Sequence, residues 1–186
     1  PKTRVDTERL LGSLGVALVP VESPDEAELV FINTCAFIQP ATEESVRTIA
    51  QAIADIEELP KRPLLAVAGC LVGRYHAEDL APELPEVDLW LDNSDLEAWP
   101  AMLARKLGLP EPTVPGRILS TGPSYAWLKI SDGCRHACSF CAIPNIRGGH
   151  RSHCKDMIVR EARALLDQGV KELNLVAQDL TEWGCD

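Results

Sequence analysis

The sequence lacks any long apolar run, and no stretch approaches the roughly 18 residues that a membrane-spanning helix needs. Its first residues also lack the basic-then-apolar pattern of a secretory signal peptide. Internal repeats and low-complexity tracts are missing as well. With 46% hydrophobic and 25% charged residues among 186, the chain is typical of a soluble globular protein with one large or two small domains. We therefore expect a cytoplasmic location and no membrane partner.

The seven cysteines are odd in number and unevenly spread, with three of them inside eight residues. This arrangement favours metal ligation in a reducing compartment over a disulfide framework.

Acidic residues are also unevenly distributed. Residues 1–120 hold 10 Lys and Arg against 20 Asp and Glu, whereas residues 121–186 hold 8 of each. Because an acidic segment repels phosphate and attracts basic partners, residues 1–120 favour a protein substrate over RNA.

A segment rich in chain-breaking residues divides the sequence. Residues 109–124 contain four Pro and two Gly, too many for a helix or a central strand. We predict a linker there, between an N-terminal domain at 1–108 and a second domain that begins at residue 125.

Strands and helices alternate on both sides of this linker, which predicts an α/β fold. Near-continuous apolar runs at 16–19, 29–32, 64–68 and 87–91 indicate buried parallel strands, and an apolar stripe at 40–59 indicates a helix. After the linker we expect a strand at 125–130, a loop, a helix at 156–168 capped by Gly169, and a strand at 172–177.

The loop of the second domain carries Cys134, Cys138 and Cys141 in the spacing C-x3-C-x2-C. Three thiolates so close together suit one cubic 4Fe-4S cluster. Because the cube has four irons, one iron remains free for a substrate or cofactor, which is the arrangement of a catalytic site.

The residues around these cysteines agree with an anionic cluster. From position 133 to 155 there is no Asp or Glu, but four basic residues and three of the four histidines, and positive potential favours thiolates. Structural zinc is the alternative, with one further ligand from His136, His150, His153 or Cys154. In that case the loop belongs to a non-catalytic metal-binding module for folding or docking.

The motifs in this region resemble those of the radical S-adenosylmethionine (SAM) methylthiotransferases: residues 125–134 (YAWLKISDGC), 141–148 (CAIPNIRG) and 151–152 (RS). Upstream, Cys35 in NTCAF and Cys70 in AGCL resemble the cysteine motifs of that family's N-terminal domain. The resemblance implies a parallel-sheet methylthiotransferase domain followed by the start of a radical SAM β/α barrel.

The resemblance also implies cofactors and site residues. Cys134, Cys138 and Cys141 would hold the 4Fe-4S cluster that binds and cleaves SAM, and Cys35 and Cys70 would hold part of an auxiliary 4Fe-4S cluster. Phe140 would lie near the SAM adenine. Gln178 and Asp179 would contact the SAM amino group. The alternatives are packing for Phe140, capping of a strand end for Gln178 and Asp179, and small buried side chains for the upstream cysteines.

Two branches of the family are candidates, one modifying an aspartate of a small-subunit ribosomal protein and the other an N6-isopentenyl-type adenosine in transfer RNA. The opening PKTRVDTER and the residues Ala177-Gln178-Asp179 resemble the aspartate branch. The resemblance implies a ribosomal protein substrate and a flavodoxin- or ferredoxin-like electron donor, with nucleic acid contacted through a C-terminal domain.

The chain departs from the family pattern at both ends. The third auxiliary cysteine would directly precede Pro1, and a β/α barrel takes about 200 residues or more. We therefore expect a fragment that does not turn over by itself. Cys154 and Cys185 match no motif of the family and receive no predicted role.

Overall fold

The computed structural model describes residues 1–15, 18–112 and 116–186. Two compact units are present. One, the cysteine-loop unit, combines Pro1–Ser13 with Pro115–Asp186, and the other, the sheet unit, is Leu14–Val114. Within the described part of the chain, no helix combines the length and the apolar character needed to cross a membrane.

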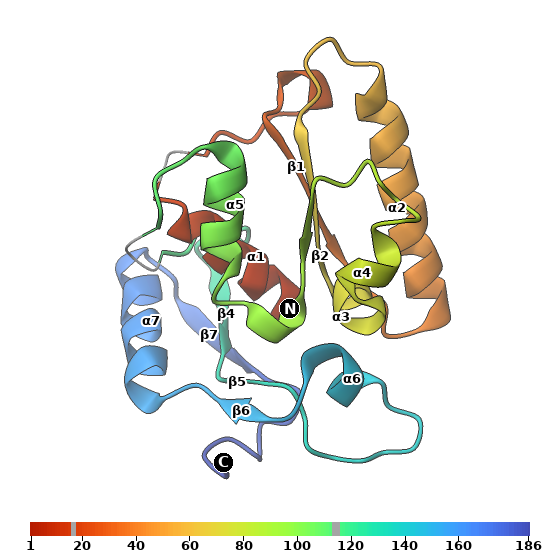
Figure 1. Ribbon diagram of the computed structural model, residues 1–186. Helices are drawn as coiled ribbons and strands as arrows, with labels where there is room; N and C mark the ends of the chain where they lie inside the picture. Colours follow the sequence, from red (N-terminus) through yellow and green to blue (C-terminus); the bar gives the residue numbers. More distant parts are fainter. Residues whose placement is uncertain (16–17, 113–115) are drawn as a thin grey trace. The chain divides into compact units, whose positions relative to one another are not determined.

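The sheet unit is built on three parallel strands, β1 (Leu29–Thr34), β2 (Leu64–Gly69) and β3 (Leu89–Leu91), in the order β1-β2-β3 (Figure 1). The central strand β2 is the most deeply buried because neighbours pair with both of its edges and helices cover it. This confirms the predicted α/β class with a parallel sheet.

Helices connect these strands. The longest, α2 (Gln39–Glu57), follows β1 and buries Thr42, Ser45, Ile49 and Ile56, which recur at helical spacing. The short helices α3 (Cys70–Tyr75) and α4 (Ala77–Leu80) follow β2, and α5 (Trp99–Leu107) follows β3 and ends at Gly108 in the left-handed conformation. Two 3-10 turns complete the unit, η1 (Pro24–Glu26) and η2 (Asn93–Asp95).

The predicted run at 16–19 lies partly outside the described residues. Of that run, Leu18 and Val19 are described, and they are not in a strand. The other three predicted strands and the predicted helix at 40–59 correspond to β1, β2, β3 and α2.

The cysteine-loop unit contains the predicted strand–helix–strand pattern. Strand β4 (Tyr125–Lys129) pairs in parallel with β7 (Glu172–Val176), and α7 (Lys155–Asp167) connects them. Their core consists of Ala126, Leu128, Ile130, Leu165 and Val170. A two-residue antiparallel pair, β5 (Ser131–Asp132) with β6 (Arg151–Ser152), and the short helix α6 (Ile143–Arg147) lie between β4 and α7.

The first helix, α1 (Lys2–Ser13), belongs to this unit although more than 100 residues separate it from its partners. It approaches residues 116–117 so closely that a Cβ on Gly12 would lie 2.3 Å from the backbone nitrogen of Arg117. Two of its four buried residues are the carboxylates Asp6 and Glu8. The expected N-terminal domain at 1–108 and linker at 109–124 therefore differ from the observed units at residues 1–13 and 115–124.

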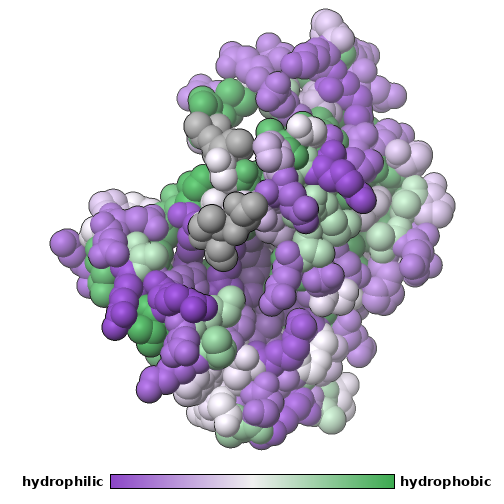
Figure 2. All heavy atoms as spheres, turned by 60° about the vertical axis from the view of Figure 1, so that its left-hand side comes forward, coloured by the Kyte–Doolittle hydropathy of each residue, from purple (hydrophilic) through white to green (hydrophobic). Residues whose placement is uncertain are grey.

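The face drawn in Figure 2 is covered mainly by hydrophilic side chains, with hydrophobic side chains in smaller groups between them. Several large apolar residues are nevertheless exposed, among them Leu166 and Leu175.

Candidate iron-sulfur site

The three predicted ligands lie on one loop, which runs from β5 to β6 and includes α6. Cys134 and Cys141 are half-buried and Cys138 is exposed, and all seven cysteines of the chain are free thiols. The Cys141 amide donates to the Cys138 carbonyl at 3.0 Å, so these two cysteines share a turn. Three free thiols on one short loop fit the donor set of a 4Fe-4S cluster.

The two ends of this loop are joined at its base. The Cys134 amide donates to the Gly148 carbonyl at 3.2 Å, and the Gly133 amide donates to Asp132 Oδ1 at 3.0 Å. Gly133 has φ +68°, and a Cβ at this position would lie 2.0 Å from the Gly149 carbonyl oxygen. Only glycine therefore permits this approach of the two chain segments.

Carboxylates from elsewhere in the unit neutralise the basic side chains of the loop. Arg135 forms an ion pair with Glu182, and Arg147 with Asp6 and Asp132. Two of the four basic residues at positions 133–155 are thus paired with carboxylates. The inference that positive potential favours thiolates is weakened, whereas the thiol arrangement itself is unaffected.

The predicted SAM contacts Gln178 and Asp179 follow the carboxyl end of β7. His136, which lies between two of the cysteines, places Nε2 3.0 Å from Asp179 Oδ2, so the strand end and the loop are brought together. Hydrogen bonds from the Thr181 hydroxyl and from His136 lower the pKa of Asp179 to about 2. Asp179 is thus ionised at neutral pH.

Gln178 and Phe140 differ in exposure. Both polar atoms of the Gln178 amide are buried and have no hydrogen-bond partner among the described residues. Phe140 is 88% exposed, which does not fit the packing role considered as its alternative. Glu182 was not predicted as a site residue and His136 only as a possible zinc ligand, yet ligand atoms of His136, Asp179 and Glu182 lie within 4.8 Å of one another.

The two upstream cysteines directly follow the ends of two neighbouring strands, at the same edge of the sheet unit. Register pairs Thr34 with Gly69, so Cys35 and Cys70 each follow directly on a paired residue. Thr34 Oγ1 donates to the Ala68 carbonyl at 2.6 Å, which ties the strand ends together. Cys35 is exposed and Cys70 is buried. Two thiols suit part of a cluster but cannot hold a whole one in the usual way.

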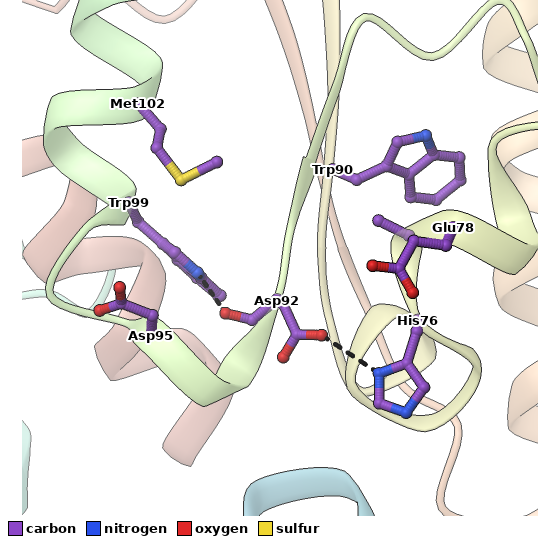
Figure 3. A pocket seen from close by; sticks show the side chains of 8 residues that line it. His76, Glu78, Trp90, Asp92, Asp95, Trp99 and Met102 are labelled. Carbon is purple, nitrogen blue, oxygen red and sulfur yellow. Dashed lines mark hydrogen bonds and ion pairs between the residues drawn. The ribbon is translucent and has the colours of Figure 1, made fainter.

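A separate pocket of about 290 Å³ lies in the sheet unit, beyond the end of β3. Figure 3 shows His76 Nδ1 directed at the Asp92 carboxylate, 3.5 Å away, and the Trp99 indole nitrogen donating to the Asp92 carbonyl at 2.7 Å. Trp90, Glu78, Asp95 and Met102 also line it. The pocket contains none of the cysteines, so it is distinct from the predicted metal chemistry.

Acid should destabilise the cysteine-loop unit through His153. Burial, together with the positive charges of Arg9 and Lys129, lowers the pKa of His153 to about 4. Because an unfolded histidine titrates near about 6.5, the unfolded chain takes up the proton first. The free energy of unfolding should therefore fall as the pH drops from about 6.5 to about 4.

A His153→Gln variant, which cannot titrate, should lose this part of the pH dependence. Hydrogen exchange of the β4 and β7 amides at pH 7.5, 6.0 and 5.0 measures the effect in this unit. Burial alone would raise the pKa of Glu161, but the hydrogen bond and charge of Arg9, together with Arg117, hold it below its ordinary value, so this carboxyl contributes only in stronger acid. Equal pH slopes in the variant and the wild type would contradict the prediction.

The chain is similar to known proteins both in part and over its whole length. Residues 1–92 match the family described as "Uncharacterized protein family UPF0004". The chain is also similar over its whole length to proteins named methylthiotransferases. The predicted resemblance is thereby confirmed.

Three relatives carry the name ribosomal protein uS12 methylthiotransferase RimO. The chain is 69% identical to that of Nitratidesulfovibrio vulgaris (strain DP4), 62% to that of Oleidesulfovibrio alaskensis and 48% to that of Aquifex aeolicus. All of the chain is covered in each comparison, against 43%, 43% and 40% of the relatives. The chain thus spans less than half the length of these relatives.

Proposed function

We propose that this chain takes part in the methylthiolation of an aspartate side chain of ribosomal protein uS12 by radical SAM chemistry. The observation that carries the proposal is a loop of three free thiols, closed at its base, in a chain 69% identical over 186 residues to a uS12 methylthiotransferase. A ribosomal substrate would place the reaction in the cytoplasm.

Cys134, Cys138 and Cys141 would hold a 4Fe-4S cluster. When bound, such a cluster leaves one iron free for SAM, whose reductive cleavage supplies a radical that can take hydrogen from an unactivated carbon. An electron donor of flavodoxin or ferredoxin type would supply the electron.

The chain's own side chains would position SAM. The Gln178 amide offers a donor and an acceptor that no described residue uses, and the ionised Asp179 can accept hydrogen bonds from an ammonium group. The exposed ring of Phe140 offers a face on which an adenine can stack. Cys35 and Cys70 would supply two thiolates to an auxiliary cluster, with the third ligand from outside this sequence.

Metal analysis tests the cluster. Anaerobic reconstitution of the wild-type chain should give about four irons and matching labile sulfide at the three-cysteine site. Cys134→Ala, Cys138→Ala or Cys141→Ala should lose this iron. Cys154→Ala and Cys185→Ala are the matched controls and should keep it. Zinc without labile sulfide would support the non-catalytic metal module instead.

Mass spectrometry tests the substrate. The full-length protein that carries this sequence, incubated with SAM, a reductant and either uS12 or transfer RNA, should add a methylthio group to uS12. Modification of the RNA alone would reject the aspartate branch. The acidic character of residues 1–120 supports the basic ribosomal protein as substrate.

A further inference from the structure

Four buried side chains form a closed ring of alternating charge beneath the cysteine loop. We call them the charge ring: Asp6, Lys129, Asp132 and Arg147, each 1–5% exposed. Lys129 pairs with Asp6 and, at 2.7 Å, with Asp132. Arg147 Nη1 lies 3.3 Å from Asp6 and 3.0 Å from Asp132. Each carboxylate therefore bridges both cations.

The ring touches both ends of the cysteine loop. Asp132 Oδ1 also accepts the Gly133 amide, next to Cys134. Arg147 ends α6 and precedes Gly148, whose carbonyl accepts the Cys134 amide. The bonds that fix Asp132 and Arg147 thus also fix the backbone on which Cys134 lies.

Asp6 is the only ring member from outside the segment 129–147, because it comes from α1. With Asp6 the ring holds two positive and two negative charges. Without it, Lys129 and Arg147 would share Asp132 as the one remaining ring carboxylate, and the buried ring would carry a net positive charge. Buried charges of this kind are strongly unfavourable, so the base of the loop should rearrange.

We propose that Asp6 is a positioning residue for Cys134. By completing the charge ring, α1 fixes the base of the cysteine loop, and with it the backbone of Cys134, before any metal is present. The significance of Cys134 as a cluster ligand rests on the proposed function, but the positioning itself is a property of the metal-free chain.

A second buried carboxylate on the same helix provides a matched control. Glu8 is 2% exposed and pairs with Arg117 and Ser120, away from the cysteine loop. Asp6→Asn and Glu8→Gln each remove one buried negative charge from α1, so a general weakening of helix docking would affect both variants alike.

Amide hydrogen exchange of Cys134 in the metal-free, full chain tests the proposal. Asp6→Asn should speed exchange of this amide about tenfold or more relative to the β4 amides, whereas Glu8→Gln should not change that ratio. Alkylation of the Cys134 thiol should accelerate in the same variant. An unchanged ratio in Asp6→Asn, or an equal change in Glu8→Gln, would overturn the proposal.

A double variant covers the case in which Asp6→Asn does not fold. Asp6→Asn with Lys129→Met leaves one cation and one anion in the ring, so the ratio should return toward the wild-type value. A double variant that folds with a fast-exchanging Cys134 amide would reject the charge-balance argument.

Iron loading separates this inference from the proposed function. If the wild-type chain takes up zinc and no iron, the proposed function fails while the exchange result still decides the role of Asp6. If iron loads but Asp6→Asn leaves Cys134 exchange unchanged, the positioning role alone fails.

Discussion

Alanine at position 133 is expected to open the base of the cysteine loop and to destabilise its unit by about 2–5 kcal/mol. A non-glycine residue at φ +68° costs about 1–2 kcal/mol. The added Cβ would also lie 2.0 Å from the Gly149 carbonyl oxygen and 2.7 Å from that of Gly148, and such overpacking costs about 1–3 kcal/mol. Both carbonyls are backbone atoms, so no rotamer change can relieve the contact.

Gly148→Ala is the control for this variant. Gly148 has φ +74° and ψ −171°, a conformation that essentially only glycine adopts, so alanine there costs about 1–3 kcal/mol, but no atom lies within 4 Å of its ideal Cβ position. Hydrogen exchange of the β4 and β7 amides in increasing urea should show the larger loss of stability in Gly133→Ala. Iron uptake should fall in the same order. An equal loss of stability in the two variants would contradict the close contact between Gly133 and Gly149 at the loop base.

Arg117→Met is expected to cost about 3–5 kcal/mol, because it leaves the buried Glu8 carboxylate without its cationic partner, whereas Glu161 keeps Arg9. The Arg117 side chain is 5% exposed and donates to Glu8 at 2.7 and 2.9 Å and to Glu161 at 2.9 Å. Glu8 would keep only its bonds to Ser120. Exchange of the α1 amides should rise most, since this network holds α1 to residues 117–120.

A more exposed ion pair in the sheet unit, between an arginine and an aspartate, serves as the control for this variant. Arg62 pairs with Asp88 at 2.8 Å, but both side chains are about a third exposed, at 34% and 32%. Arg62→Met should therefore cost about 1 kcal/mol or less. Arg117→Met combined with Glu8→Met should recover much of the stability, because both charges then leave the interior. A cost near that of Arg62→Met would show that Arg117 is solvated.

Elements held by apolar burial were predictable from the sequence. Runs of Leu, Val, Ile and Ala identified β1, β2, β4 and β7, and the stripes identified α2 and α7 to within two residues at each end. Their hydrophobicity is a local property of the chain, and the same residues form the cores. Parallel pairing followed from strands that are apolar on both faces.

Helix α1 was not predictable on the same grounds. Half of its buried residues are carboxylates, and their partners Arg117 and Lys129 lie more than 100 residues away in the sequence. The residues next to a charged side chain in the sequence do not show whether that side chain will be buried against a distant partner. Segment 109–124 was expected to be a linker because it is rich in Pro and Gly. In the structure, Arg117 and Ser120 of this segment instead form hydrogen bonds with Glu8 of α1.

The candidate site likewise has a part that the sequence predicted and a part that it did not. Spacing alone identified Cys134, Cys138 and Cys141, because ligands of one cluster can lie close together in sequence. The carboxylates that approach the loop, Asp6, Asp179 and Glu182, come from distant segments. The charge of residues 133–155 by themselves therefore left these three carboxylates out of account.

The pairing of α1 with residues 117–147 has a consequence for synthesis on the ribosome. Asp6 and Lys129 are 123 positions apart, and the whole sheet unit is made between them. Because the ribosome adds about 5–20 residues per second, Lys129 is synthesised roughly 6–25 s after Asp6. During that time the charged side chains of α1 keep it soluble without a core to cover it. Helix α1 is thus made well before the residues that hold it in the folded unit.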